Sequence, residues 1–202
     1  MVMACSKLLT YRASGMVHIL LLAGFHGSGK DTLGREIVKR HPSYRCIALS
    51  AYAKDIAAKR HGFNRAWADL YEEKDQPREE YGGKSIRDLV RSTWEALDRE
   101  DPLMTANMLV AEINRGRPSD GYIITDFRYQ RDYWKLLSAF GRPTIKTVRI
   151  QRDCVLPPDR HQMPEEYALE AFPFDVIIDN PESGTPEELY NSFIKVVELT
   201  RL

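Results

Sequence analysis

The segment from Val17 to Arg40 constrains the fold of this chain more than any other. Its first part, Val17–Ala23, is a short apolar run of the kind found in buried parallel strands, and residues 33–40 carry apolar side chains at helical spacing. Between them lies the glycine-rich sequence GFHGSGKDT, residues 24–32. A glycine-rich turn alone is also typical of an ordinary strand-to-helix connection. The flanking strand and helix, together with the lysine in the turn, favour a phosphate-binding loop.

This loop follows the general pattern G-x-x-x-x-G-K-S/T except at one position. Gly24, Gly29 and Lys30 fit the pattern, Asp31 stands where serine or threonine is usual, and Thr32 follows. The glycines let successive N–H groups turn toward phosphate oxygens, while the lysine and the start of the helix add positive charge. We therefore expect a nucleoside triphosphate to bind here. The residues expected to contact it are Gly24, His26, Gly27, Ser28, Gly29, Lys30, Asp31 and Thr32.

Length and composition fit one globular domain without a nucleic-acid or membrane signature. The 202 residues include equal numbers of basic and acidic side chains, so there is no global attraction to polyanions. No apolar run approaches the ~20 residues of a membrane span. The three cysteines are scattered and odd in number, which favours a reducing, cytoplasmic compartment over a disulfide framework. We expect residues 1–16 to form a poorly ordered extension ahead of a domain spanning 17–202.

Apolar runs and helical patterns alternate along the rest of the chain. Strands are predicted at 17–23, 45–49, 122–126, 144–150 and 174–179, and helices at 33–40, 51–61, 85–97, 101–113, 129–140 and from 186 to about 200. This alternation predicts an α/β fold with a five-stranded parallel sheet and helices on both faces. The polar segments 63–83, which includes the acidic run from Asp69 to Asp75, and 152–174 are expected to be mobile lids.

Several polar residues follow predicted strands, where parallel sheets gather their ligands. Ser50, Asp126 and Asn180 share this edge with the loop. Asp126 suits either a carboxylate near magnesium or a cap for the next helix. Ser50 and Lys54 suit either an anionic acceptor or a helix N-cap with a solvated lysine.

Cations near the same edge are candidates for holding phosphate, because phosphoryl transfer depends mainly on positioning and on positive charge. Each of them also suits an ordinary surface position. The candidates are Arg128, Arg131, Arg149 and Arg152. His161, with Glu165 and Glu166, has no second histidine at ligand spacing, so we do not expect zinc.

In this order, the motifs resemble those of the phage deoxynucleoside monophosphate kinases and, in the same superfamily, the animal-type phosphomevalonate kinases. The resemblance runs from about Val17 to the C-terminus, and Gly-Lys-Asp in the loop is a feature of this group. The matching features are Ser28-Gly-Lys-Asp31, Leu49-Ser50 with Lys54, Arg87, Asp126-x-Arg128, Val148-Arg149, and Phe174-Asp175 through Asn180 before a Glu-Glu-Leu helix.

This resemblance implies a P-loop kinase fold in which ATP, with Mg²⁺, donates its γ-phosphate to a small acceptor that already carries a phosphate. The implied catalytic residues are Lys30, Asp31, Asp126 and Arg128, and the implied metal-binding residues are Asp31, Thr32 and Asp126. Asn180 would lie near the adenine. The implied acceptor-binding residues are Ser50, Lys54, Arg87, Arg128, Arg149, His161 and Glu166, with Lys54, Arg87 and Arg128 on the acceptor phosphate.

Two details of the resemblance bear on the acceptor. Asp159-Arg-His161 with Glu166 resembles the Asp-x-His segment of the phage enzymes, and the phosphomevalonate kinases lack that histidine, which favours a nucleotide. Phe127 stands where both groups usually have a small polar residue, and segment 63–83 matches neither.

The leading interpretation is an ATP-dependent kinase of (deoxy)nucleoside monophosphates, acting as a monomer or a homodimer. The alternatives are a kinase of hydroxymethylated pyrimidine in phage DNA, a phosphomevalonate-type kinase, and a non-catalytic ATP-binding module. The neutral net charge disfavours DNA as the acceptor.

Overall fold

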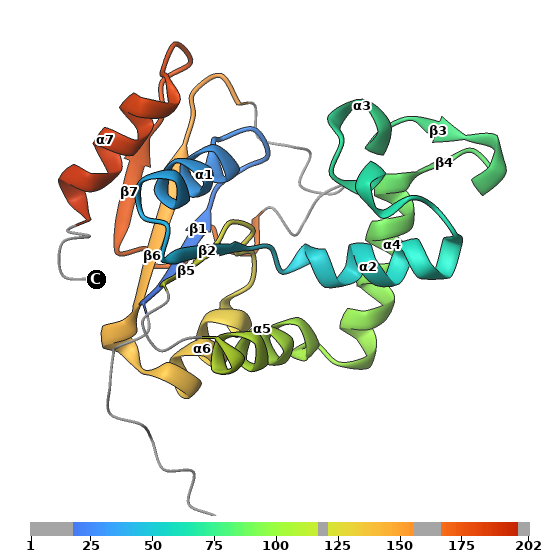
Figure 1. Ribbon diagram of the computed structural model, residues 1–202, viewed down its shortest axis with the longest axis horizontal. Coiled ribbons are helices and arrows are strands. Elements are labelled where there is room, and N and C mark those ends of the chain that lie inside the picture. The colour runs from blue at the N-terminus through green and yellow to red at the C-terminus, as the bar shows by residue number, and fades with distance from the viewer. Residues whose placement is uncertain (1–17, 117–120, 156–166, 198–202) are drawn as a thin grey trace, which may run out of the picture.

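A five-stranded parallel sheet forms the centre of the computed structural model, which describes residues 18–116, 121–155 and 167–197 (Figure 1). Its strand order is β2-β5-β1-β6-β7. The strands are β1 His18–Ala23, β2 Tyr44–Ile47, β5 Gly121–Ile124, β6 Ile145–Gln151 and β7 Val176–Asp179. All four strand pairs are parallel, which confirms the predicted α/β class and the five-stranded sheet.

Helices cover both faces of this sheet, as the alternating pattern predicted. Helices α1 (Lys30–Arg40) and α7 (Pro186–Val196) lie on one face, and α5 (Met104–Arg115) and α6 (Gln130–Phe140) lie on the other (Figure 1). Successive residues of β1 point to opposite faces, so Leu20 and Leu22 pack under α1 and α7, while Ile19 and Leu21 pack against α5 and α6. Within the described ranges, no helix is both long and apolar enough to cross a membrane.

Beside the sheet, α2 (Ser50–His61) and α4 (Ile86–Glu100) carry a small unit, residues 63–85 (Figure 1). It contains the helix α3 (Tyr71–Lys74) and a hairpin of β3 (Pro77–Arg78) and β4 (Lys84–Ser85). Phe63 and Ala68 are buried against Ala57 and Leu89 of the two helices. Because of this apolar contact, the segment folds into short defined elements rather than an irregular polar stretch.

Local sequence signals set most helix ends. A capping box at Ser85 starts α4, a second at Thr185 starts α7, and Gly141, with φ of 83°, ends α6. The predicted start at Asp101 was wrong by a few residues. α5 begins at Met104, and Asp101 accepts a hydrogen bond from the backbone N of Leu103 at 2.9 Å.

Gly34 allows α1 to lie close to the sheet. A Cβ atom at this position would lie 2.8 Å from Cγ2 of Thr125 and 3.1 Å from Sγ of Cys46. We expect Gly34→Ala to lower the free energy of unfolding by about 1–3 kcal/mol, since overpacking outweighs the gain in helix propensity. Denaturant titration measures the change in unfolding free energy, with Arg35→Ala on the exposed face of α1 as the control. A Gly34→Ala protein as stable as the parent would contradict it.

Candidate functional site

The loop between β1 and α1 has a backbone that only glycine readily adopts. Gly24, Gly27 and Gly29 have φ angles of 144°, 83° and 107°. A side chain at Gly24 would overlap the carbonyl oxygen of Ile150, and a Cβ at Gly29 would lie 2.7 Å from Nδ2 of Asn180. The glycines therefore let the loop lie directly against the ends of β6 and β7.

Lys30 and the start of α1 concentrate positive charge at this loop. The Lys30 ammonium donates to the carbonyl oxygens of Gly24 at 2.6 Å and of Phe25 at 2.8 Å, so the side chain folds back over the loop. Gly29 is the N-cap of α1, and no side chain caps this helix start, whereas α4 and α7 have capping boxes. Amides at a helix start that no side chain caps attract anions, because the helix dipole adds to their own partial charge.

Asn180, at the end of β7, holds the loop backbone in place through hydrogen bonds. It is 5% exposed, and its Nδ2 donates to the carbonyl oxygen of Ser28 at 2.9 Å. Its backbone N donates to Gln151 at 2.7 Å, which joins the end of β7 to the end of β6. The resemblance placed Asn180 near the adenine. In the structure, its side-chain amide holds the loop backbone.

The carboxylate of Asp126 links two neighbouring strand ends. Its two oxygens accept from the backbone N of Leu49 and of Ser50, each at 2.7 Å. It therefore caps the start of α2, the helix that follows the neighbouring strand β2, rather than the helix that follows Asp126 in the sequence. Ser50 is the first residue of α2 and Leu49 its N-cap, so the serine hydroxyl is not the cap.

Asp31 and Asp126 share one neighbourhood at this edge. Cys46 is exposed as a residue, but its sulfur faces α1, and this partial burial, with the negative charges of Asp31 and Asp126, raises the pKa of the thiol to about 11. Thr32 follows Asp31 in the first turn of α1. These residues offer oxygen atoms, the ligands that Mg²⁺ prefers. Among the residues that the structure describes, no group of three or more acidic, histidine or cysteine side chains is placed to hold a metal ion.

Two of the cations predicted for the acceptor phosphate already contact carboxylates of the small unit. Lys54 on α2 pairs with Asp69 at 2.7 Å, and Arg87 on α4 pairs with Asp75 at 3.0 Å. Partial burial would raise the pKa of Asp69, but hydrogen bonds from Lys54 and Arg65 lower it below its ordinary value. The acidic run is thus engaged in ion pairs rather than simply solvated.

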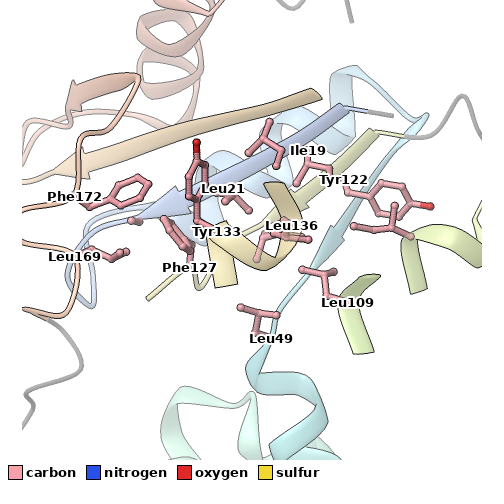
Figure 2. Packing of buried hydrophobic residues seen from close by; sticks show 14 residues of the cluster. Ile19, Leu21, Leu49, Leu109, Tyr122, Phe127, Tyr133, Leu136, Leu169 and Phe172 are labelled. Atoms are coloured by element: carbon pink, nitrogen blue, oxygen red, sulfur yellow. The ribbon is translucent and has the colours of Figure 1, made fainter. Parts of the chain in front are cut away.

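A hollow beside the loop brings two other predicted cations together. It opens between the first loop residues and the ends of β5 and β6, and apolar side chains form most of its wall. The residues that line it are Ala23, Gly24, Phe25, Phe127, Arg128, Arg149, Leu169 and Phe174. Figure 2 shows Phe127, Leu169 and Phe172 gathered at the carboxyl end of β1. Hence Arg128 and Arg149 share one site with the loop, and Lys54 and Arg87 do not line it.

The remaining predicted residues are dispersed. Arg131 pairs with Asp98, and Arg152 donates to the carbonyl oxygen of Glu182 at 2.8 Å. His26 is exposed on the loop, and Ser28 is buried within it. His161 and Glu166 lie outside the described residues.

Sequence reasoning missed the aromatic wall of the hollow and the buried carboxyl of Asp132. The only signal for the wall was Phe127, noted as a departure from the resemblance. Phe25, Leu169 and Phe174 come from distant parts of the chain and show no common spacing. Asp132 falls in the first turn of a helix, where an acidic side chain is usually exposed.

Asn180→Ala is expected to loosen the loop. The substitution leaves the buried carbonyl of Ser28 without its donor, at a cost of about 1–3 kcal/mol of unfolding free energy. Hydrogen exchange of the amides of residues 24–31 should become faster. Asn107→Ala, on the exposed side of α5, is the matched control. Unchanged exchange at the loop in Asn180→Ala would exclude the supporting role.

Asp132 is expected to make stability depend on pH. It is 2% exposed, and its Oδ1 has no hydrogen-bond partner within the described part of the chain. Burial raises its pKa to about 7, Arg131 opposes the shift, and Asp126 and Asp98 add to it. Between about pH 4 and 7 the folded protein keeps a proton that the unfolded chain has lost, so stability falls as pH rises through this range.

Replacing Asp132 with asparagine should remove this dependence. At pH 8 the variant should be more stable than the parent by on the order of a few kcal/mol, and near pH 4 the difference should disappear. Thermal unfolding across this pH range tests the expectation, with the exposed Asp153→Asn as the control. Parallel pH profiles for parent and Asp132→Asn would show that Asp132 is not the group responsible.

Comparisons with known proteins find similarity to solved structures, at low sequence identity. No protein-family model matches the chain, and no curated protein matches it. A sugar kinase from a Janibacter species is 15% identical with a TM-score of 0.48, covering 91% of this chain and 95% of that one. TT1252 from Thermus thermophilus is 18% identical with a TM-score of 0.48, covering 93% and 98%. Shikimate kinase from Bacteroides thetaiotaomicron is 18% identical with a TM-score of 0.40, covering 92% and 99%. At these identities and TM-scores, the likenesses carry no information on activity.

Proposed function

We propose that this protein is an ATP-dependent phosphotransferase that converts a (deoxy)nucleoside monophosphate into the diphosphate. The observation that carries the proposal is the glycine loop. Three glycines with positive φ, the Lys30 ammonium and a helix start without a side-chain cap converge on one spot. Such a site suits a chain of phosphates, because backbone N–H groups and a cation together balance its charge.

The donor side would consist of the loop, Lys30 and the two carboxylates beside it. Lys30 now donates to two neutral carbonyl oxygens, and a phosphate oxygen is a stronger acceptor for the same ammonium group. Asp31, Thr32 and Asp126 would hold Mg²⁺ through oxygen atoms. When bound, Mg²⁺ neutralises charge on the donor phosphates.

The acceptor side would lie across the sheet edge from the donor. Arg128 and Arg149 share the hollow with the loop, whereas Lys54 and Arg87 do not line it and pair with Asp69 and Asp75. An oxygen of the acceptor phosphate would form a bond to the γ-phosphorus of ATP while the bond to the β,γ-bridging oxygen breaks, and ADP leaves. The cations hold both phosphates in line for this transfer.

Replacement of Lys30 tests the donor site. We expect Lys30→Ala to lower turnover by on the order of 10²-fold or more, because its positive charge acts where negative charge concentrates during transfer. The folded state should persist, since the ammonium group lies in the loop and not in either main core cluster. Lys39→Ala on the exposed side of α1 is the control. Near-normal turnover in a folded Lys30→Ala protein would contradict the assignment.

The assay itself separates the proposed reaction from its alternatives. Incubation with ATP, Mg²⁺ and each common ribo- and deoxyribonucleoside monophosphate should yield ADP and the matching diphosphate, resolved by chromatography. Phosphorylation of mevalonate 5-phosphate or of hydroxymethylated DNA, without any nucleoside diphosphate, would overturn the proposed acceptor. ATP binding without transfer to any of these compounds would identify a non-catalytic binding module.

A further inference from the structure

The hollow beside the loop combines two chemical features in one place. Phe25, Phe127 and Phe174 supply flat apolar walls, and Arg128 and Arg149 supply guanidinium groups. Guanidinium groups bind phosphate through paired hydrogen bonds and also stack on flat rings. Together, these features match a planar ring that carries a phosphate.

Arg149 is placed to serve such a ligand. It lies on β6 in register with Ala23, the last residue before the loop. Its guanidinium carbon lies 5.8 Å from the centre of the Phe174 ring. Among the residues that the structure describes, no carboxylate pairs with Arg149, in contrast to Lys54 and Arg87. Its charge is therefore available to an anion in the hollow.

Phe127 forms the fixed wall of the hollow. Its backbone N donates to the carbonyl oxygen of Leu22 at 3.2 Å, which ties it to β1. Its ring is 2% exposed and packs edge-on against Phe172 at 5.4 Å and Phe174 at 6.4 Å between ring centres. A ring held on several sides cannot easily turn aside, so Phe127 limits the depth of the hollow.

On the loop side of the hollow, Phe25 is more exposed than Phe127. Phe25 is half-buried on the loop and contacts the half-buried Tyr167, with 5.5 Å between ring centres. The free volume between the walls is about 20 Å³, roughly the space of one water molecule. This volume is smaller than a ring, so the walls of the hollow have to move apart to admit one, and a one-ring base requires less movement than a two-ring base.

We propose that this hollow is the acceptor subsite, that Phe127 limits it to one-ring bases, and that Arg149 binds the acceptor together with Arg128. The substrate class is then a pyrimidine nucleoside monophosphate. This inference rests on the proposed function and narrows it. In this arrangement, Lys54 and Arg87 act mainly through Asp69 and Asp75, fastening the small unit to α2 and α4.

Direct binding tests the subsite without requiring turnover. Calorimetric titration of the protein with dCMP, dTMP, dAMP and dGMP in the absence of ATP should show pyrimidine monophosphates binding at least fivefold more tightly than purine monophosphates. Phe127→Leu should reduce this ratio to about twofold or less, because the smaller side chain deepens the hollow. Arg149→Gln should weaken binding of all four by about tenfold without changing the ratio. Phe140→Leu, in the same core cluster but on α6 away from the hollow, is the matched control and should leave the ratio unchanged.

The binding and turnover measurements separate the proposed subsite from the proposed kinase reaction. All variants are titrated at a temperature well below their own unfolding midpoints. If Phe127→Leu does not fold, Arg149→Gln still tests the proposal, because Arg149 is only half-buried. The predicted binding pattern without any diphosphate formation would sustain the subsite and reject the kinase reaction. Diphosphate formation with equal or tighter purine binding, or with binding insensitive to Arg149→Gln, would reject the subsite and leave the reaction standing.

Discussion

The close contact between the glycine loop and the ends of β6 and β7 is the constraint on which the site depends. At Gly24 and Gly29 there is no room for a Cβ atom, because the Ile150 carbonyl and the Asn180 amide fill that space. The contact fixes the direction in which α1 leaves the sheet, and with it the positions of Lys30 and Asp31. It also places the first loop residues against the hollow that Arg149 borders. Anion binding at the loop and recognition of a second group beside it thus rest on the same backbone.

Three consecutive residues after β5 organise the other side of the site. Asp126 caps α2 on the neighbouring strand, Phe127 fills the core below the end of β1, and Arg128 lines the hollow. Phe127 anchors the segment, because its burial holds Asp126 and Arg128 at the edge of the sheet. The cap and the cation are therefore positioned by packing as well as by hydrogen bonds.

Much of this arrangement could be predicted from the sequence, because the signals are local. The loop between Val17 and Arg40 carries its own glycines and flanking periodicity, and the capping boxes at Ser85 and Thr185 identify helix starts. Interactions between distant residues gave no such signal. The Asp126 cap on α2 joins residues 76 and 77 positions apart, and the Asn180 amide reaches back 152 positions to Ser28. Likewise, the pairing of Lys54 with Asp69 depends on how residues 63–85 fold, and periodicity does not encode that.

The central position of β1 has a consequence for how this chain reaches its native state. The first strand pairs on one side with residues 121–124 and on the other with residues 145–149. Its apolar side chains emerge from the ribosome well before their partners in the sheet are made. Contacts of such long sequence separation form slowly, and an unpaired apolar strand promotes aggregation in the interval. During synthesis, the residues between β1 and β5 are the part of the chain that follows β1 and is available to cover it before its sheet partners are made.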